Sequence, residues 1–356
     1  MIRQQKLTVI TLIFCLTHSL SSCSTLAYYQ QSVRGHLQMM HTSEDIESLL
    51  GSIHTSDRLK KRLQLVSRIR DFASEVLLLP DNQSYRRYAD IGRKFIVWNV
   101  VATPSFSLTP EQSCFLFIGC LSYRGFFNYK DAETYAQNLE NQELDVYLGG
   151  VSAYSTLGWF DDPVLNGMLD RSDTDLARLL FHELAHQLLY IKHDTEFNEA
   201  FADAVALIGV GLWLESFASE AEKLAFNGDL KRERQFTELV LVYQTKLRQL
   251  YQSSLDDEAK MQEKSTIYKE LRQDYINLRD NWGGNNEYDL WFENKLNNAK
   301  ISAVSTYRNL LPHFITAFEA SGRDLNQFYS LIREISACDM NKRRKHLRSM
   351  TSPRNC

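Results

Sequence analysis

Two histidines near the middle of the chain have the spacing of a metal site. His182, Glu183 and His186 form the pattern H-E-x-x-H. On a helix, residues four apart lie on one face, so both imidazole rings can reach the same metal ion. Glu183 lies one step round the helix, where it can reach a metal-bound water rather than the metal. A zinc-dependent hydrolase needs this division of roles.

The segment around this motif is expected to form a buried helix. Ser172, Asp173 and Thr174 offer an N-cap, and leucines recur at helical spacing on both sides of the motif. Burying two imidazoles and a carboxylate in an apolar interior is costly unless something pairs with them. A divalent metal ion is the usual compensation.

A second helical segment supplies the remaining metal ligand. It begins with N-E-A-F-A-D from Asn198 and continues with apolar residues. Glu199 and Asp203 are four residues apart and project to one side of this helix. Glu199 can therefore be the third metal ligand, and Asp203 can accept the second ring N–H of a ligating histidine and fix its tautomer.

N-E-x-x-A-D after H-E-x-x-H resembles the glutamate-zincin peptidases, the thermolysin-like group that uses this glutamate as a zinc ligand. Twelve residues separate His186 from Glu199, fewer than in thermolysin-like enzymes, so the connecting turn must be tight. The metzincin pattern fails, because it needs a glycine and then a histidine where this chain has Leu189 and Lys192. His193, one place further on, is interpreted as a loop histidine.

Longer runs extend the resemblance over most of the chain. They are Y-R-G-F-F from Tyr123, A-Y-S-T-L-G-W-F-D-D-P from Ala153, and N-N-A-K-I-S-A-V-S-T-Y from Asn297 with L-P-H-F after it. With the metal motif, these runs resemble a family of bacterial zinc aminopeptidases in the glutamate-zincin group. The resemblance implies one Zn²⁺ and a peptide substrate.

Residues 1–22 are expected to be a lipoprotein signal peptide. Arg3 and Lys6 precede an apolar run over 7–16, and at about ten residues this run is too short to span a bilayer. L-S-S-C, ending at Cys23, resembles a bacterial lipobox, which implies cleavage before Cys23 and its lipidation. We therefore expect a protein anchored in the bacterial cell envelope, on the periplasmic side of the outer membrane. No later stretch is expected to cross a membrane.

Charge and cysteine usage agree with an exported protein. The net charge of −4 gives no basic field, so nucleic acid is not expected as a partner. Four cysteines follow Cys23, an even number for an oxidising compartment. They allow three pairings, of which Cys114–Cys120 and Cys338–Cys356 are predicted. Cys114 and Cys120 could equally be reduced, buried thiols.

The periodicity predicts a predominantly helical α+β protein, and the resemblance implies one zincin-like domain over 23–356. The strand just before the metal helix is expected at the edge of a small mixed sheet, where an extended peptide could be held. Its Gly149-Gly150 pair would allow a peptide or the metal helix to approach closely. Helices are expected over 42–79, 84–91 and 130–141, and strands over 94–103, 115–121 and 143–155.

The C-terminal half is expected to be helical. Residues 218–280 have apolar positions at helical period among dense charges, which predicts a long helical hairpin insertion broken near 253–257. Residues 281–356 then form a helical C-terminal part. The basic run over 342–348 is interpreted as a solvated tail or helix end, with contact to anionic lipids as an alternative.

Peptide hydrolysis also needs a donor that stabilises the oxyanion of the tetrahedral intermediate. In related zincins a tyrosine or histidine in the C-terminal half has this role. Tyr307 is the first candidate here, followed by Tyr154 and His313.

Two segments are candidates for substrate binding. Tyr154, Asp161 and Asp162 lie in the run before the metal helix, where an acid could pair with a free peptide amine. An ordinary loop is the alternative interpretation of this run. Asn297 and Asn298 could bind the main chain of a substrate.

We predict a zinc aminopeptidase with Glu183 as general base. An envelope endopeptidase is the first alternative, and it would lack a closed acidic subsite for the amine. A non-catalytic lipoprotein with a structural metal site is the second, and it would close the fourth coordination position of the metal.

Overall fold

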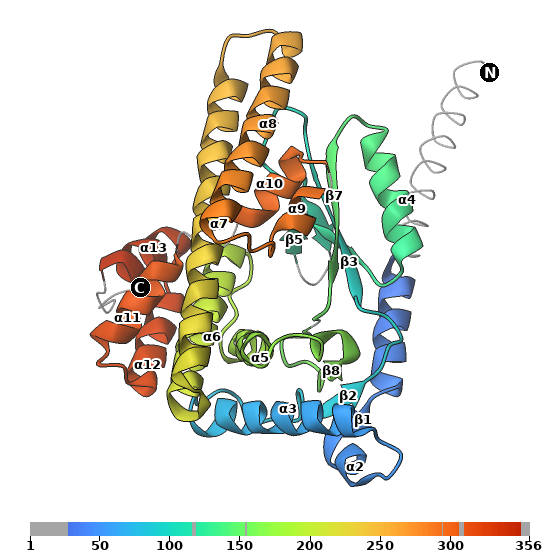
Figure 1. Cartoon of the computed structure of the whole chain (residues 1–356), viewed down its shortest axis with the longest axis vertical. Coiled ribbons are helices and arrows are strands. Elements are labelled where there is room, and N and C mark those ends of the chain that lie inside the picture. Colours follow the sequence, from blue (N-terminus) through green and yellow to red (C-terminus); the bar gives the residue numbers. More distant parts are fainter. Residues whose placement is uncertain (1–27, 116–118, 154, 294, 306–309, 350–356) are drawn as a thin grey trace, which may run out of the picture.

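The computed structural model describes residues 28–115, 119–153, 155–293, 295–305 and 310–349. These parts of the chain are mostly helical, with small sheets, which confirms the predicted α+β class (Figure 1). The predictions for Cys23, Tyr154, Tyr307 and Cys356 fall outside the described residues, as does the signal peptide.

The two helices of the metal motif lie at the centre of the protein (Figure 1). Helix α5 (Asp173–Leu188) carries H-E-x-x-H, and helix α6 (Thr195–Phe217) carries the downstream acids, as predicted. The Ser172 side chain caps α5 by accepting from a backbone N–H of the first turn, and Asp194 does the same for α6. Both helices therefore begin at well-defined residues.

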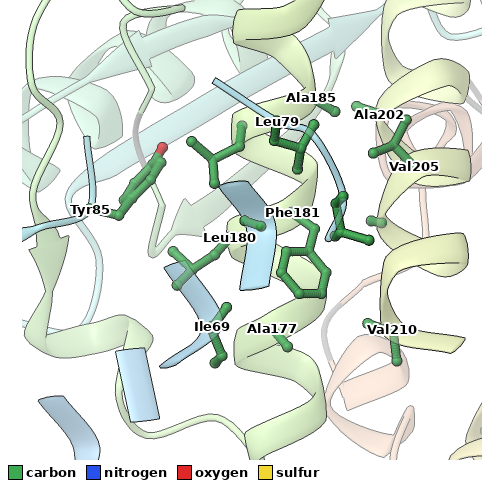
Figure 2. Close-up of a cluster of buried hydrophobic side chains, with 14 of the residues drawn as sticks. Ile69, Leu79, Tyr85, Ala177, Leu180, Phe181, Ala185, Ala202, Val205 and Val210 are labelled. Atoms are coloured by element: carbon green, nitrogen blue, oxygen red, sulfur yellow. The ribbon is translucent and has the colours of Figure 1, made fainter. Parts of the chain in front are cut away.

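A large apolar core packs around this helix pair (Figure 2). Leu180 and Phe181 of α5 and Val205 of α6 are at most 1% exposed. Gly209 lets the helices approach closely, because a Cβ there would lie 2.8 Å from the Phe181 ring. Burying each large apolar side chain contributes about 1.5–3 kcal/mol, so this core fixes the relative position of the metal-site residues.

Helix α6 also has the length and composition of a membrane span, which the sequence interpretation did not foresee. Of its most apolar window, 61% is buried inside the protein. The central helix of a folded core passes the same test of length and hydropathy. The apolar residues of α6 are accounted for by packing around the metal motif.

The sheet beside this core has the strand order β6-β3-β7, with antiparallel neighbours. Strands β3 (Val97–Thr103) and β7 (Asp145–Val151) confirm two predicted strands, and β6 comprises Arg124–Phe126. Among the described strands, β7 lies at an edge of this sheet, as predicted.

The glycines of β7 serve a different purpose from the predicted one. A Cβ at Gly150 would lie 2.4 Å from the Phe95 ring, and one at Gly149 would lie 3.0 Å from Tyr147. The glycines therefore make room for aromatic rings of the same sheet rather than for a peptide.

A second small sheet corrects one predicted helix. Residues 87–89, within the helix expected over 84–91, form strand β2 (Arg87–Ala89). This strand pairs with β1 (Glu44–Asp45) and with β8 (Val164–Leu165). Both partners are distant in sequence, so local periodicity could not reveal the pairing.

A short hairpin carries a disulfide bond. Strands β4 (Ser113–Phe115) and β5 (Gly119–Leu121) pair antiparallel, and Cys114 is bonded to Cys120 with an S–S distance of 2.01 Å. This is the predicted pairing rather than two reduced thiols. Cys338 is buried, and its predicted partner is not among the described residues.

The long helical hairpin is present. Helices α7 (Glu220–Gln252) and α8 (Asp257–Asn281) lie side by side along the long axis of the molecule (Figure 1). They have their own apolar core, centred on Val240, Leu247 and Leu271. The other helices are 28–41, α2 (Ile46–Gly51), α3 (Asp57–Glu75), α4 (Tyr129–Glu140), α9 (Asp289–Glu293), α10 (Asn298–Ser305), α11 (Leu311–Ala320), α12 (Leu325–Ser336) and α13 (Met340–Ser349).

Candidate metal centre

The three predicted metal ligands meet between α5 and α6. One ligand atom each from His182, His186 and Glu199 lies within 4.8 Å of the others. The two histidine Nε2 atoms are 3.1 Å apart, and the Glu199 carboxylate oxygens lie 3.4 Å from His182 Nε2 and 3.7 Å from His186 Nε2. Two imidazole nitrogens and one carboxylate therefore face a common point.

These separations suit a small divalent ion. Zinc bonds of about 2.0–2.1 Å in a tetrahedral arrangement place ligand atoms roughly 3.3 Å apart, and the three separations found here, 3.1, 3.4 and 3.7 Å, lie around that value. The side chains of His182, His186 and Glu199 are 19%, 8% and 29% exposed, so solvent reaches one side of the cluster. A two-histidine, one-glutamate set leaves a coordination position for water or substrate.

Asp203 lies behind His182, as predicted. Its Oδ1 is 3.1 Å from His182 Nδ1, so it can accept a hydrogen bond from Nδ1 and leave Nε2 to face the ligand cluster. Burial lowers the pKa of His182, but hydrogen bonds with Asp203 and Glu199 outweigh it and raise this pKa to about 10. Burial likewise opposes ionisation of Glu199, yet hydrogen bonds from both histidines hold its pKa well below the usual range. The cluster favours a positive charge at its centre.

The tight turn between the two helices is held by Asn198. Its side-chain oxygen accepts from Ile191 N, and its amide donates to Ile191 O, both at 2.8 Å. Asn198 is 1% exposed, so these bonds are shielded from water. His193 lies in this turn with φ 64°, outside the ligand cluster and against Gly119, consistent with its interpretation as a loop histidine.

The basic C-terminal run lies in helix α13, which agrees with the helix-end interpretation, but part of it is buried and holds this turn instead of facing solvent. Arg343 of α13 is 6% exposed and forms an ion pair with Asp194, the cap of α6. Arg344 binds Asp194 and also Glu196, the latter at 3.2 Å. The negative charge of the buried aspartate offsets the free-energy cost of burying the arginine.

The acids of the site act on a group of tyrosines that the sequence interpretation missed. Burial and the charge of Glu199 raise the pKa of Tyr123 to about 12, and Glu183 contributes to the same shift. Burial and Glu199 also raise the pKa of Tyr190. Tyr123 belongs to the Y-R-G-F-F run, which was the available signal for its role. Tyr85 lies near Glu183 from another loop, for which the sequence gave no signal.

The two predicted acidic residues before α5 differ. Asp161 is exposed, whereas Asp162 is fully buried. Asp162 Oδ2 accepts from the backbone N–H of Thr156 at 2.7 Å and from its hydroxyl at 3.0 Å, so this oxygen stabilises the loop. A substrate amine cannot reach Asp162 in this arrangement. Asp161 is the acid of this pair that a substrate could contact.

The two predicted asparagines have structural contacts. Asn297 donates to the backbone oxygen of Val146 in β7 at 2.7 Å. Asn298 is 0% exposed, and its side-chain oxygen accepts from the hydroxyls of Tyr251 and Tyr268, both at 2.6 Å. These hydrogen bonds give no support to substrate binding by either asparagine.

The fold and the site define a helical α+β protein with a candidate His-His-Glu metal centre of the H-E-x-x-H type. A family model described as "Putative aminopeptidase" matches residues 27–347. The chain therefore belongs to this aminopeptidase family. No curated protein and no solved structure gave a match.

Proposed function

We propose that this protein is a zinc aminopeptidase of the glutamate-zincin group, anchored in the bacterial cell envelope through Cys23. The convergence of His182, His186 and Glu199, with Asp203 behind His182, is the observation that carries the catalytic part. Membership in the aminopeptidase family supports a peptide substrate with a free amine. The lipobox-like sequence before Cys23 supports the anchor.

Each residue of the site has a defined task in this proposal. His182, His186 and Glu199 hold the ion, and Asp203 keeps His182 in the correct tautomer. Bound zinc would polarise the scissile carbonyl and make a water molecule acidic. Glu183 takes the proton of the attacking water and later gives it to the leaving amine.

The oxyanion donor is assigned to a tyrosine. Tyr307 is the candidate from the sequence, and Tyr123 joins it because the charges of both Glu199 and Glu183 raise its pKa. A phenol beside the metal can donate a hydrogen bond to the oxygen on which charge develops. Asp161 is the candidate acid for the substrate amine, because its side chain is exposed.

The test compares wild type with Glu183→Gln in a protein that starts after Cys23. Elemental analysis is expected to find one zinc per chain in both forms. Only wild type is expected to hydrolyse free-amine peptides, with a rate loss in Glu183→Gln of about 10²- to 10⁴-fold. N-acetylated versions of the same peptides should resist cleavage.

Three outcomes would contradict parts of this proposal. Cleavage of the acetylated peptides would favour the endopeptidase alternative. Zinc in both forms without any turnover would favour a structural metal site. If wild type held no stoichiometric metal, His182, His186 and Glu199 would not be metal ligands.

A further inference from the structure

Tyr85 has a backbone conformation that a tyrosine rarely adopts. Its φ is 62°, in the left-handed region, and its side chain is 0% exposed. A bulky residue without a local side-chain hydrogen bond is strained there, and such strain persists only where the surrounding structure imposes it. Strained residues of this kind concentrate at functional sites.

A buried arginine imposes the conformation of this loop. Arg70 of α3 is 0% exposed, and its guanidinium donates to the backbone oxygens of Pro80, Asn82 and Ser84 at 2.6, 3.0 and 2.9 Å. The backbone N–H of Tyr85 then donates to a backbone oxygen of the neighbouring loop at 2.6 Å. The loop is thus fixed on both sides of Tyr85.

The same loop is hydrogen-bonded to α5 at Gln187, one turn beyond Glu183. Asn82 donates to the Gln187 side-chain oxygen at 2.8 Å, and the Gln187 amide donates to the Ser84 hydroxyl at 3.2 Å. The Tyr85 ring lies beside α5, with its hydroxyl directed from the Ala177 end towards the Ala185 end (Figure 2). The position of Tyr85 is therefore coupled to that of α5.

The polar groups around Tyr85 are buried and incompletely satisfied. Within the described residues, the Tyr85 hydroxyl and Asp162 Oδ1 are buried and have no well-formed hydrogen bond. Ser155 lies beside both groups, and Glu183 is close enough for its charge to act on both. Burial, with Glu183 contributing, raises the pKa of Asp162 to about 6. Other buried atoms of this kind occur in the described residues, for example in β3, but this pair lies in the loops packed beside the helix that carries the proposed base.

We propose that Tyr85, with Asp162 beside it, is a positioning residue for Glu183. The Tyr85 hydroxyl donates to the Glu183 carboxylate when substrate is bound. The Asp162 carboxylate, held by Thr156, adds a fixed charge near Glu183. This inference rests on the proposed function of Glu183 as general base.

Tyr85→Phe tests the inference, with Tyr88→Phe as the matched control. Tyr88 is a buried tyrosine three residues further on, in β2. We expect Tyr85→Phe to lower kcat about 10- to 100-fold while KM and zinc content stay within twofold of wild type. The denaturant midpoint of the metal-free protein should be nearly unchanged, because the lost hydroxyl makes no well-formed hydrogen bond. Tyr88→Phe should leave kcat unchanged.

The outcomes separate this inference from the proposed function. If wild type turns over and Tyr85→Phe matches it in kcat, or if Tyr85→Phe lowers the midpoint in step with kcat, the positioning role is wrong. If wild type itself hydrolyses no peptide, the proposed function fails and the inference fails with it. Should Tyr85→Phe not fold, Asp162→Asn decides: a fall in kcat at constant KM supports the inference, and an unchanged kcat overturns it.

Discussion

The helix pair α5–α6 and the hairpin α7–α8 both bury polar side chains, but they treat them differently. In the hairpin, the Tyr243 hydroxyl donates to Asp274 at 2.5 Å, and Gln244 donates to a backbone oxygen of α10 at 2.8 Å. All of α7 and α8 is described, and neither helix has a buried side-chain nitrogen or oxygen without a hydrogen-bond partner. Around α5 and α6, within the described residues, His186 Nδ1, Asp162 Oδ1 and the Tyr85 hydroxyl have none.

This difference in hydrogen bonding separates a region that only packs, the hairpin, from a region that we propose carries out chemistry. Leaving a buried polar group unpaired costs about 1–3 kcal/mol, so selection for stability alone would remove such groups. In the hairpin, every buried side-chain nitrogen and oxygen has a hydrogen-bond partner. Near the proposed metal ion and the proposed base, three buried atoms have none. Buried side-chain atoms without partners also occur elsewhere, for example Asn99 Oδ1 and Thr103 Oγ1 in β3, so the three near the metal centre mark the site only together with the converging ligands.

The largest effect on stability is expected where the C-terminal helix holds the turn of the metal helix pair. Arg343→Met leaves Asp194 buried with only Arg344 as a partner, whereas both now bind it. Removing one side of a buried ion pair costs about 3–5 kcal/mol. We expect the lower end of this range, measured by chemical denaturation of the metal-free protein.

Arg348→Met is the control for this change. Arg348 is an exposed residue of the same helix, and its loss should alter the unfolding free energy by less than about 0.5 kcal/mol. Equal effects of the two variants would show that Arg343 does not stabilise the turn. The metal centre would then be held by α5 and α6 alone.

A smaller effect is expected from Asp203→Asn, which acts on metal binding rather than on folding. The amide cannot accept the His182 N–H with the strength of a carboxylate, so His182 loses orientation and basicity. Zinc affinity should fall about 10- to 100-fold, measured by competition with a chelator of known affinity. Glu215→Gln, an exposed change in the last turns of α6, should leave this affinity unchanged. A normal zinc affinity in Asp203→Asn would show that Asp203 does not support metal binding.

The metal ligands could be predicted from the sequence because helical spacing alone brings them together. His182 and His186 are one turn apart on one helix, and Glu199 and Asp203 are one turn apart on the next. Only the tight turn between the helices was needed to make the four converge. Local patterns were sufficient wherever the chemistry depended on residues close in sequence.

The residues around the ligands could not be predicted, because distant contacts determine their positions. Tyr85 comes from a loop held by Arg70, whereas the sequence placed it inside the helix expected over 84–91. Arg343 lies 149 residues from Asp194, so its run of basic neighbours suggested solvent. In both cases a buried partner elsewhere in the chain outweighed the local preference of the sequence.

The hairpin should give the smallest effects, and none on catalysis. Tyr243→Phe removes the hydrogen bond to Asp274, an exposed acid, so the unfolding free energy should fall by about 1 kcal/mol. Lys246→Gln breaks an ion pair with Glu270 in which both side chains are nearly half exposed, and should cost less than about 0.5 kcal/mol. Peptide turnover and zinc content should match wild type in both variants. A side chain that only packs affects stability and not kcat. A loss of turnover in Tyr243→Phe at full zinc content would therefore show that the hairpin takes part in catalysis.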